Sequence, residues 1–288
     1  MQYPAILDCL DRGAPVSLNG VGGGCIAESS IATFADKTSV FVKCAAGAPD
    51  MFEREAEGLA ALAAAKAIRV PAVLAVDREA LVLEQIGQGA PGADFFATFG
   101  RQFARMHRYQ GVSCGFDHDN YIGSSPQKNQ PLPDASNDGS DWPEFFIERR
   151  LRFQVRLAAE NGHGETLVRL LDGCEHRLNE MLCCAIEPPC ILHGDLWGGN
   201  YLTDEAGQPC LIDPAVYFGH READLAMTRL FGGFASDFYA AYQEAFPLAE
   251  GCEERLAAYQ LYHLLNHLNL FGTAYYAQSE RILRQYAG

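Results

Sequence analysis

Short runs of apolar and β-branched residues predict a small β-rich unit in the first part of the chain. We expect strands where such runs are bounded by turn residues, at residues 16–19, 25–34, 39–44, 70–76 and 80–84. Residues 35–38 have the composition of a tight turn. A helical pattern runs from Asp50, the expected N-cap, to Lys66, with Glu53 completing a capping box.

The remainder of the chain has the three-to-four-residue spacing of apolar positions that is typical of helices. Residues 94–109 carry a stripe of aromatic residues at this spacing, which indicates a core-facing helix rather than a cofactor site. Further helices are expected at residues 142–161, 164–184, 221–231, 235–245 and 252–278. Residues 111–141 are long, polar and broken by prolines, as in a functional or mobile loop.

A glycine-rich stretch without an apolar period, residues 86–92, is the best candidate for a linker. It divides the chain into an N-terminal lobe (1–85) and a larger, mainly helical C-terminal lobe (93–288). The predicted fold class is therefore α+β, with two lobes.

Composition narrows the possible partners and compartments. The formal net charge of −15 disfavours nucleic acid and anionic membrane surfaces, because binding to either depends on basic residues. The first residues have neither the basic region nor the apolar core of a signal peptide, and no apolar run is long enough to span a bilayer. The ten cysteines form no C-x-x-C pair and no zinc spacing, which favours reduced thiols in the cytoplasm.

Residues 193–200, HGDLWGGN, followed by Asp213, form the strongest candidate for a catalytic centre. Phosphoryl transfer from ATP needs a carboxylate near the attacking hydroxyl and hard oxygen ligands for Mg²⁺. Asp195 is the candidate base, and Asn200 and Asp213 are the candidate metal ligands. The interval between the last two fits a hairpin with a turn at residues 204–207. The alternative is a surface loop with ordinary turn acids.

Gly22, Gly23, Gly24 and Cys25 lie between the first two predicted strands. Successive backbone N–H groups in such a turn can bind phosphate, although a tight hairpin is an equal alternative. Cys25 has two interpretations. If its thiol lies beside these N–H dipoles and a lysine, it would oxidise readily; if it is only a small loop residue, it would not.

Lys43 lies in a predicted strand and is the candidate lysine for pairing the α- and β-phosphates of ATP. The alternative is a solvated lysine at a strand end. In the next helix Glu55, Leu59 and Leu62 share one face, so Glu55 is the preferred ionic partner. Glu53 and Glu57 are competitors. Backbone groups from Glu84 to Ile86, at the end of the last strand, are expected to bond the adenine edge.

The whole chain resembles the fructosamine kinase (ketosamine-3-kinase) family, within the larger group of aminoglycoside-phosphotransferase-like kinases. The resemblance is nearly end to end, and its matching stretches are residues 22–26, 51–55, 120–123, 142–146, 148–151, 193–197, 212–217 and 221–226. Two details depart from the patterns of the wider kinase group. Ala27 stands where a family Asn is expected, and Asp213 is followed by Pro214 rather than by Phe-Gly. The Asp-Pro pair matches the fructosamine kinase family itself and implies no control by an activation loop.

The resemblance implies a two-lobed protein-kinase-like fold and ATP-dependent, Mg²⁺-dependent phosphorylation of the C3 hydroxyl of ketosamines. These are adducts of sugars with amines, and the phosphorylated adduct is unstable, so that the amine is regenerated. Bacterial-type members are expected to prefer ribulosamines or erythrulosamines. By matching position, Lys43 pairs the phosphates, Asp195 is the base, and Asn200 and Asp213 are the metal ligands.

Several further residues have two interpretations within this resemblance. Trp197 and Tyr217 either stack on the amine arm of the substrate or pack within the lobe. Glu222 either pairs the protonated amine or is an exposed first-turn acid. Asp224 either complements a helix dipole or, as a buried acid, holds the catalytic loop. His193 is expected to brace that loop by hydrogen bonds.

Two other functions compete with a ketosamine kinase. One is a kinase for another small hydroxylated amine, such as an aminoglycoside or a choline-like compound; residues 120–150 favour the ketosamine. The other is a pseudokinase that only binds ligands. It would be expected to lack Lys43, Asp195, Asn200 or Asp213, and all four are present.

Overall fold

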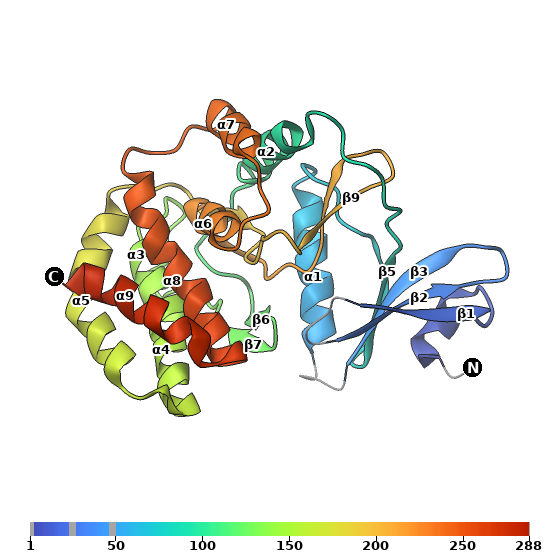
Figure 1. Ribbon diagram of the computed structural model, residues 1–288, viewed down its shortest axis with the longest axis horizontal. Coiled ribbons are helices and arrows are strands. Elements are labelled where there is room, and N and C mark those ends of the chain that lie inside the picture. Colours follow the sequence, from blue (N-terminus) through green and yellow to red (C-terminus); the bar gives the residue numbers. More distant parts are fainter. Residues whose placement is uncertain (1–2, 23–26, 46–49, 288) are drawn as a thin grey trace.

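A five-stranded antiparallel sheet forms the N-terminal part of the computed structural model, which describes residues 3–22, 27–45 and 50–287. Its spatial order is β1-β2-β3-β5-β4, and it lies at the right of Figure 1. The strands lie close to the predicted ranges: β1 Ser17–Val21, β2 Glu28–Thr33, β3 Ser39–Cys44, β4 Val73–Val76 and β5 Ala80–Glu84. Alternation and turn residues were therefore sufficient to predict these strands, although not their order in the sheet.

Two helical segments cover the two faces of the sheet. The 3-10 helix η1 (Ala5–Leu10), which the sequence pattern did not predict, packs Ile6 and Leu7 against Val40 and Val42. The long helix α1 (Met51–Ala64) covers the opposite face. Because side chains alternate along β3, Lys43 points to the α1 side of the sheet, as expected.

The predicted capping box of α1 is wrong. Asp50 makes no side-chain hydrogen bond to the helix backbone. Its carboxylate accepts hydrogen bonds from Arg54 Nε (3.0 Å) and from Tyr121 Oη (2.8 Å) instead. Asp50 thus ties the start of α1 to residues of the second lobe.

The second lobe is mainly helical and lies at the left of Figure 1, with residues 85–92 connecting it to β5 without helix or strand. Its α-helices are α2 Phe95–Met106, α3 Trp142–Phe145, α4 Phe153–Ala158, α5 Thr166–Cys183, α6 Glu222–Leu230, α7 Ser236–Ala245, α8 Cys252–Phe271 and α9 Tyr276–Ala287. Helix α2 packs on α7, α5 on α9, and α6 on α8.

Two predicted helices differ in detail from the structure. The segment predicted at 142–161 contains π-helical turns, η2 (Phe146–Arg152) and η3 (Ala159–His163), on either side of α4. The helix predicted at 252–278 ends at Phe271, because Gly272 adopts a positive φ of 92°. A 3-10 turn, η4 (Thr273–Tyr275), then leads into α9.

The second lobe also contains three small two-stranded sheets. The predicted hairpin after the HGDLWGGN stretch is confirmed as β9 (Tyr201–Thr203) and β10 (Pro209–Leu211). A second hairpin, β6 (Asn120–Ile122) and β7 (Ser125–Gln127), lies inside the predicted loop. The third pairs β8 (Cys190–Leu192) with β11 (Tyr217–Gly219).

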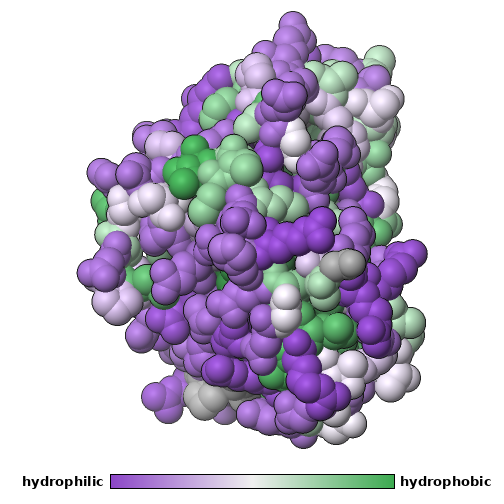
Figure 2. All heavy atoms as spheres, turned by 90° about the vertical axis from the view of Figure 1, so that its left-hand side faces the viewer, coloured by the Kyte–Doolittle hydropathy of each residue, from purple (hydrophilic) through white to green (hydrophobic). Residues whose placement is uncertain are grey.

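The outer helices are amphipathic, with polar residues facing outward. Figure 2 views the helical end of the molecule, where hydrophilic residues predominate and apolar ones form small groups. The opposite face of α5 buries Leu167, Leu171, Leu178 and Leu182 in the core. In the part of the chain that the structure describes, none of the helices has the length and apolar character needed to cross a membrane.

Candidate active site

The cleft between the lobes brings together residues that are far apart in the sequence. It is lined from the sheet side by β3 and α1, and from the helical side by the β6–β7 hairpin, the HGDLWGGN loop and the end of α8. Six predicted site residues line this one cleft: Lys43, Glu55, Asp195, Trp197, Asn200 and Asp213.

Lys43 bridges two carboxylates across the cleft. Its Nζ lies 2.6 Å from Glu55 Oε1, which is the pair preferred from the sequence, and 2.5 Å from Asp213 Oδ1. The competitor Glu57 pairs with Arg54 instead. Burial alone would lower the pKa of Lys43, but the charges of Glu55 and Asp213 outweigh it and raise that pKa. The amine therefore stays protonated and ready to hold an anion.

Asp195 and Asn200 are fixed to each other within the loop. Asn200 Nδ2 donates to the backbone oxygen of Asp195 (2.8 Å) and to its Oδ2 (3.1 Å). Burial raises the pKa of the Asp195 carboxyl well above its usual value; the Asn200 bond opposes this shift and the charge of Asp213 adds to it. A carboxylate of raised pKa is a stronger base than an ordinary aspartate.

The donor set around Asp213 fits Mg²⁺. Because Asn200 uses its Nδ2 on Asp195, its Oδ1 is turned away from that residue and remains an oxygen donor. Asp213 uses one oxygen on Lys43, and its side chain is 45% exposed. No cluster of three or more His, Cys, Asp or Glu suited to a metal occurs among the described residues. Mg²⁺ is commonly bound by one or two protein oxygens together with substrate phosphates.

A close contact between two backbone segments sets the position of this loop. Gly194 has a φ of 81°, and a Cβ at this position would lie 2.0 Å from Ala215 O, so only glycine fits. Ala215 N donates to His193 O (2.8 Å), and His193 Nε2 lies 2.9 Å from Ile212 O. His193 thus makes the bracing contacts expected of it, while Asp213 adopts a left-handed φ of 54° beside them.

Asp224 holds the backbone of the same loop. Its Oδ2 accepts from His193 N (2.7 Å) and its Oδ1 accepts from Gly194 N (2.8 Å). The other side of this arrangement was missed from the sequence: His107 Nε2 lies 3.2 Å from Asp224 Oδ2, and His107 Nδ1 lies 2.7 Å from Tyr242 Oη. A histidine at the end of an aromatic stripe gave no signal of this contact.

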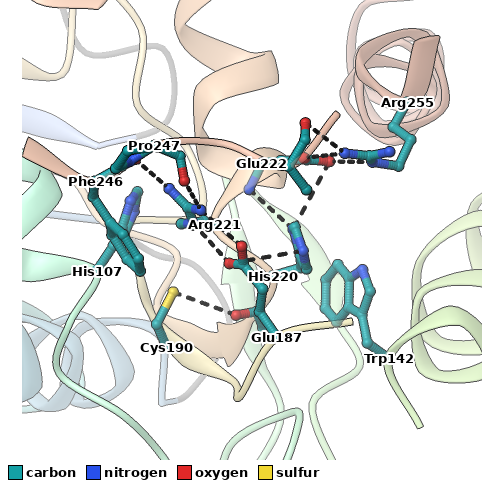
Figure 3. A network of polar contacts seen from close by, with 12 residues as sticks. His107, Trp142, Glu187, Cys190, His220, Arg221, Glu222, Phe246, Pro247 and Arg255 are labelled. Carbon is teal, nitrogen blue, oxygen red and sulfur yellow. Dashed lines mark hydrogen bonds and ion pairs between the residues drawn. The ribbon is translucent and has the colours of Figure 1, made fainter. Parts of the chain in front are cut away.

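Glu222 is placed away from the cleft, so neither interpretation of it from the sequence is correct. It is fully buried, and both its oxygens accept hydrogen bonds from Arg255 at 2.7 Å. Figure 3 shows this pair beside His220 and a second pair, in which the buried Arg221 contacts the partly exposed Glu187. Its carboxylate is therefore engaged inside the helical lobe and does not face a ligand.

Tyr217 is also buried, whereas Trp197 is at the cleft. The Tyr217 ring stacks on Trp142 and lies under the Arg150 guanidinium, 4.0 Å from the ring centre. A contact of Tyr217 with the substrate is thus not supported. Trp197 is 41% exposed and lines the cleft. Its ring packs on Gly199, where a Cβ atom would lie only 2.4 Å from the ring.

The predicted adenine contacts are only partly available. Glu84 N donates to Ala72 O, and the Glu84 carboxylate pairs with Arg69 at 2.8 Å. Ile86 is buried, and its backbone oxygen accepts from the Gln85 side chain. Of the predicted phosphate loop, Gly22 is exposed; Gly23, Gly24 and Cys25 lie outside the described residues.

The β6–β7 hairpin is a part of the site that was not identified from the sequence. Asn120 Nδ2 donates to Val216 O (2.8 Å), and Gln127 Nε2 donates to Ala215 O (2.9 Å). These two carbonyls follow Asp213 closely in the chain, so the hairpin fixes the backbone beside the candidate metal ligand. Asn-Tyr-Ile is too short to show a strand period, so residues 120–123 were notable only through the family resemblance, which did not indicate this contact.

Comparison with known proteins places the chain among sugar-amine kinases. A sequence model of the fructosamine kinase family matches residues 10–287. The chloroplastic protein-ribulosamine 3-kinase of Arabidopsis thaliana is 37% identical over 93% of this chain and 82% of its own length. A crystal structure of a "putative fructosamine-3-kinase" from Thermobifida fusca is 33% identical, with a TM-score of 0.86 over 99% of both chains.

A more distant structure supports the fold class alone. An ADP-bound aminoglycoside phosphotransferase is 13% identical and has a TM-score of 0.64, covering 99% of this chain and 98% of its own. The predicted α+β fold of the kinase-like group is therefore confirmed.

Proposed function

The chain belongs to the fructosamine kinase family, and from this premise we propose that it transfers the γ-phosphoryl group of ATP to the C3 hydroxyl of ketosamines. The observation that carries the proposal is the meeting of Lys43, Asp195, Asn200 and Asp213 in one cleft. Each supplies a different requirement of phosphoryl transfer: a cation, a base and oxygen ligands for a metal. The fit of these residues also argues against a pseudokinase.

Asp195 is the proposed base. Its Oδ2 is held by Asn200, and among the described residues its Oδ1 has no hydrogen-bond partner. The free oxygen can therefore accept the proton of the attacking hydroxyl, and the raised pKa of the carboxyl favours that transfer. Gly194 and Asp224 keep the loop backbone in place while this occurs.

Lys43 is proposed to orient the phosphates from the sheet side of the cleft, with Glu55 setting the position of its amine. Asn200 and Asp213 would hold Mg²⁺ through oxygen. When bound there, the metal would supply positive charge against the negative charge that develops during transfer. Trp197, exposed at the cleft, is proposed to contact the amine arm of the acceptor.

The substrate is tested by measuring nucleotide turnover with separate acceptors. We expect ADP release with a ribulosamine or fructosamine, a phosphate at C3 by NMR, and little turnover with an aminoglycoside, with choline or without acceptor. Turnover with an aminoglycoside or choline alone would support a kinase for another hydroxylated amine. ATP binding without any turnover would support a binding protein.

Replacing Lys43 with methionine should raise the Michaelis constant for ATP and lower kcat. Glu55→Ala should give a milder form of the same defect, because Asp213 still holds the amine. The double variant should lose less than the sum of the single losses, since removing either partner already breaks the pair. Steady-state kinetics at varied ATP measure this, with Glu53→Ala on the same helix as the control. Losses that simply sum would mean that Lys43 does not act with Glu55.

The cellular location is proposed to be the cytoplasm. The nine cysteines that the structure describes, at 9, 44, 114, 174, 183, 184, 190, 210 and 252, are all unpaired. Reduced thiols are the normal state in that compartment. The related plant protein is chloroplastic, so the compartment can differ between relatives.

A further inference from the structure

The end of α8 forms a wall of the cleft that the proposed phosphoryl transfer does not use. Asn266, on this wall, is only 1% exposed and yet lines the cleft. Its Oδ1 accepts a hydrogen bond from Gln154 Nε2 at 3.3 Å. Within the described part of the chain, its Nδ2 has no hydrogen-bond partner. This atom is also not among the fully buried polar atoms, so it keeps some accessible surface. The accessible part of Asn266 therefore includes an N–H donor that faces the cleft.

Asn266 is the inner end of a chain of side-chain amides. From the outside, Asn161 Nδ2 donates to Asn269 Oδ1 at 3.0 Å. Asn269 Nδ2 then donates to Gln154 Oε1 at 2.7 Å, and Gln154 Nε2 donates to Asn266 Oδ1. Each amide thus accepts on its outer side and donates on its inner side, so the last donor is directed to the cleft.

A backbone carbonyl fixes the direction of this chain. Asn269 Nδ2 also donates to Gln154 O at 3.0 Å, and a carbonyl oxygen can only accept. Asn269 must therefore turn its NH₂ group toward Gln154, which makes Gln154 Oε1 an acceptor and Gln154 Nε2 a donor. Turning any one amide over would place two acceptors or two donors face to face. Gln154 is fully buried, where such a mismatch is costly.

We propose that Asn266 Nδ2 donates a hydrogen bond to the carbonyl oxygen of the acceptor substrate and so selects for a carbonyl at that place; this rests on the proposed function. A carbonyl oxygen can only accept, so a fixed N–H donor matches it, and the same donor rejects a cationic ammonium group. Asn266 is assigned to the phosphoryl-acceptor substrate rather than to the nucleotide because of its place in the cleft. It belongs to the helical wall, whereas Lys43 and Ser29 form the sheet wall on the phosphate side.

Asn266→Asp is the decisive variant, because aspartate has the same shape and still accepts from Gln154 but presents an acceptor to the cleft. The Michaelis constant for a ribulosamine should rise about 10- to 100-fold, as when a site loses its match to a substrate oxygen. The Michaelis constant for ATP should stay within about two-fold. Asn179→Asp on α5, which adds the same charge outside the cleft, should behave as the parent.

Gln154→Glu tests the direction of the chain without touching the cleft lining. The introduced carboxylate accepts from Asn269 on one oxygen, so its other oxygen must accept from Asn266 Nδ2, which turns Asn266 Oδ1 toward the cleft. The acceptor Michaelis constant should rise as in Asn266→Asp. A thermal melt checks that each variant is folded. If a variant is not folded, Asn266→Ala, which also removes the N–H donor, is measured in its place, and the same rise in the acceptor Michaelis constant is expected.

The carbonyl is tested with a second substrate. An analogue whose C2 carbonyl is reduced to an alcohol can donate to the carboxylate that Asn266→Asp introduces, so a smaller loss with this analogue than with the ribulosamine supports the bond to the carbonyl. Equal losses with the two substrates would contradict it. An unchanged ribulosamine constant in Asn266→Asp, or an equal rise for ATP, would overturn the proposal. Failure of the parent protein to phosphorylate any ketosamine would instead overturn the proposed function.

Discussion

Asp195→Asn should lower kcat by about 10²- to 10⁴-fold, which is the usual contribution of a positioned general base. The substitution is nearly isosteric, and the new amide oxygen can still accept the hydrogen bond from Asn200 that Asp195 Oδ2 accepts now. The geometry of the loop should therefore persist while the proton acceptor is lost. Affinity for ATP should stay close to that of the parent, because phosphate and metal contacts come from other residues.

Single-turnover kinetics with a ribulosamine and a nucleotide-binding titration separate these two effects. Asp117→Asn is the matched control, since Asp117 does not line the cleft. Near-normal kcat in Asp195→Asn would remove Asp195 from the role of base. A parallel loss of ATP affinity would show that the carboxylate acts through the structure of the loop instead.

Residues whose position depends on local pattern were predictable from the sequence. Strand alternation placed Lys43 on the side of β3 that faces α1, and helical spacing placed Glu55 on the buried face of that helix. A buried carboxylate needs a cationic partner, so these two patterns together predict the ion pair that the structure contains. The β9–β10 hairpin was predictable for a similar reason, because its turn residues are local.

Contacts that depend on how distant segments pack were not predictable. Lys43 and Asp213 are 170 residues apart, and no local period relates them. In the sequence, Glu222 has the context of an exposed first-turn acid. In the structure, α8 places Arg255 against it (Figure 3). The amide chain that ends at Asn266 joins α4, η3 and α8 in the same way. Polar residues are mostly exposed, so a sequence without its fold gives no reason to bury them.

Secondary-structure boundaries failed where two signals conflicted. Apolar spacing continues from residue 252 to beyond 272, and it favoured a single helix. Gly272 nevertheless takes a positive-φ backbone conformation that ends α8. This boundary matters for function, because it sets where the helical wall that carries Asn266 and Phe271 stops.

Asp213→Ala should reduce both Mg²⁺-dependent nucleotide binding and turnover. A metal at phosphates supplies several kcal/mol of charge stabilisation, and each ~1.36 kcal/mol is a factor of ten in rate, so a loss on the order of 10³-fold in kcat is expected. The variant also removes one of the two anions that hold Lys43, which shifts that lysine toward Glu55 alone. Unlike Asp195→Asn, this change should therefore weaken binding as well as chemistry.

Calorimetric titration of ATP with Mg²⁺ and with EDTA measures the metal-dependent part of the affinity. The parent should bind more tightly with Mg²⁺, whereas Asp213→Ala should show little difference between the two conditions. Asp213→Asn, which keeps one oxygen donor without the charge, should fall between them. If Asp213→Ala bound Mg-ATP as tightly as the parent, the metal would be held elsewhere, and Asp213 would serve only to position Lys43.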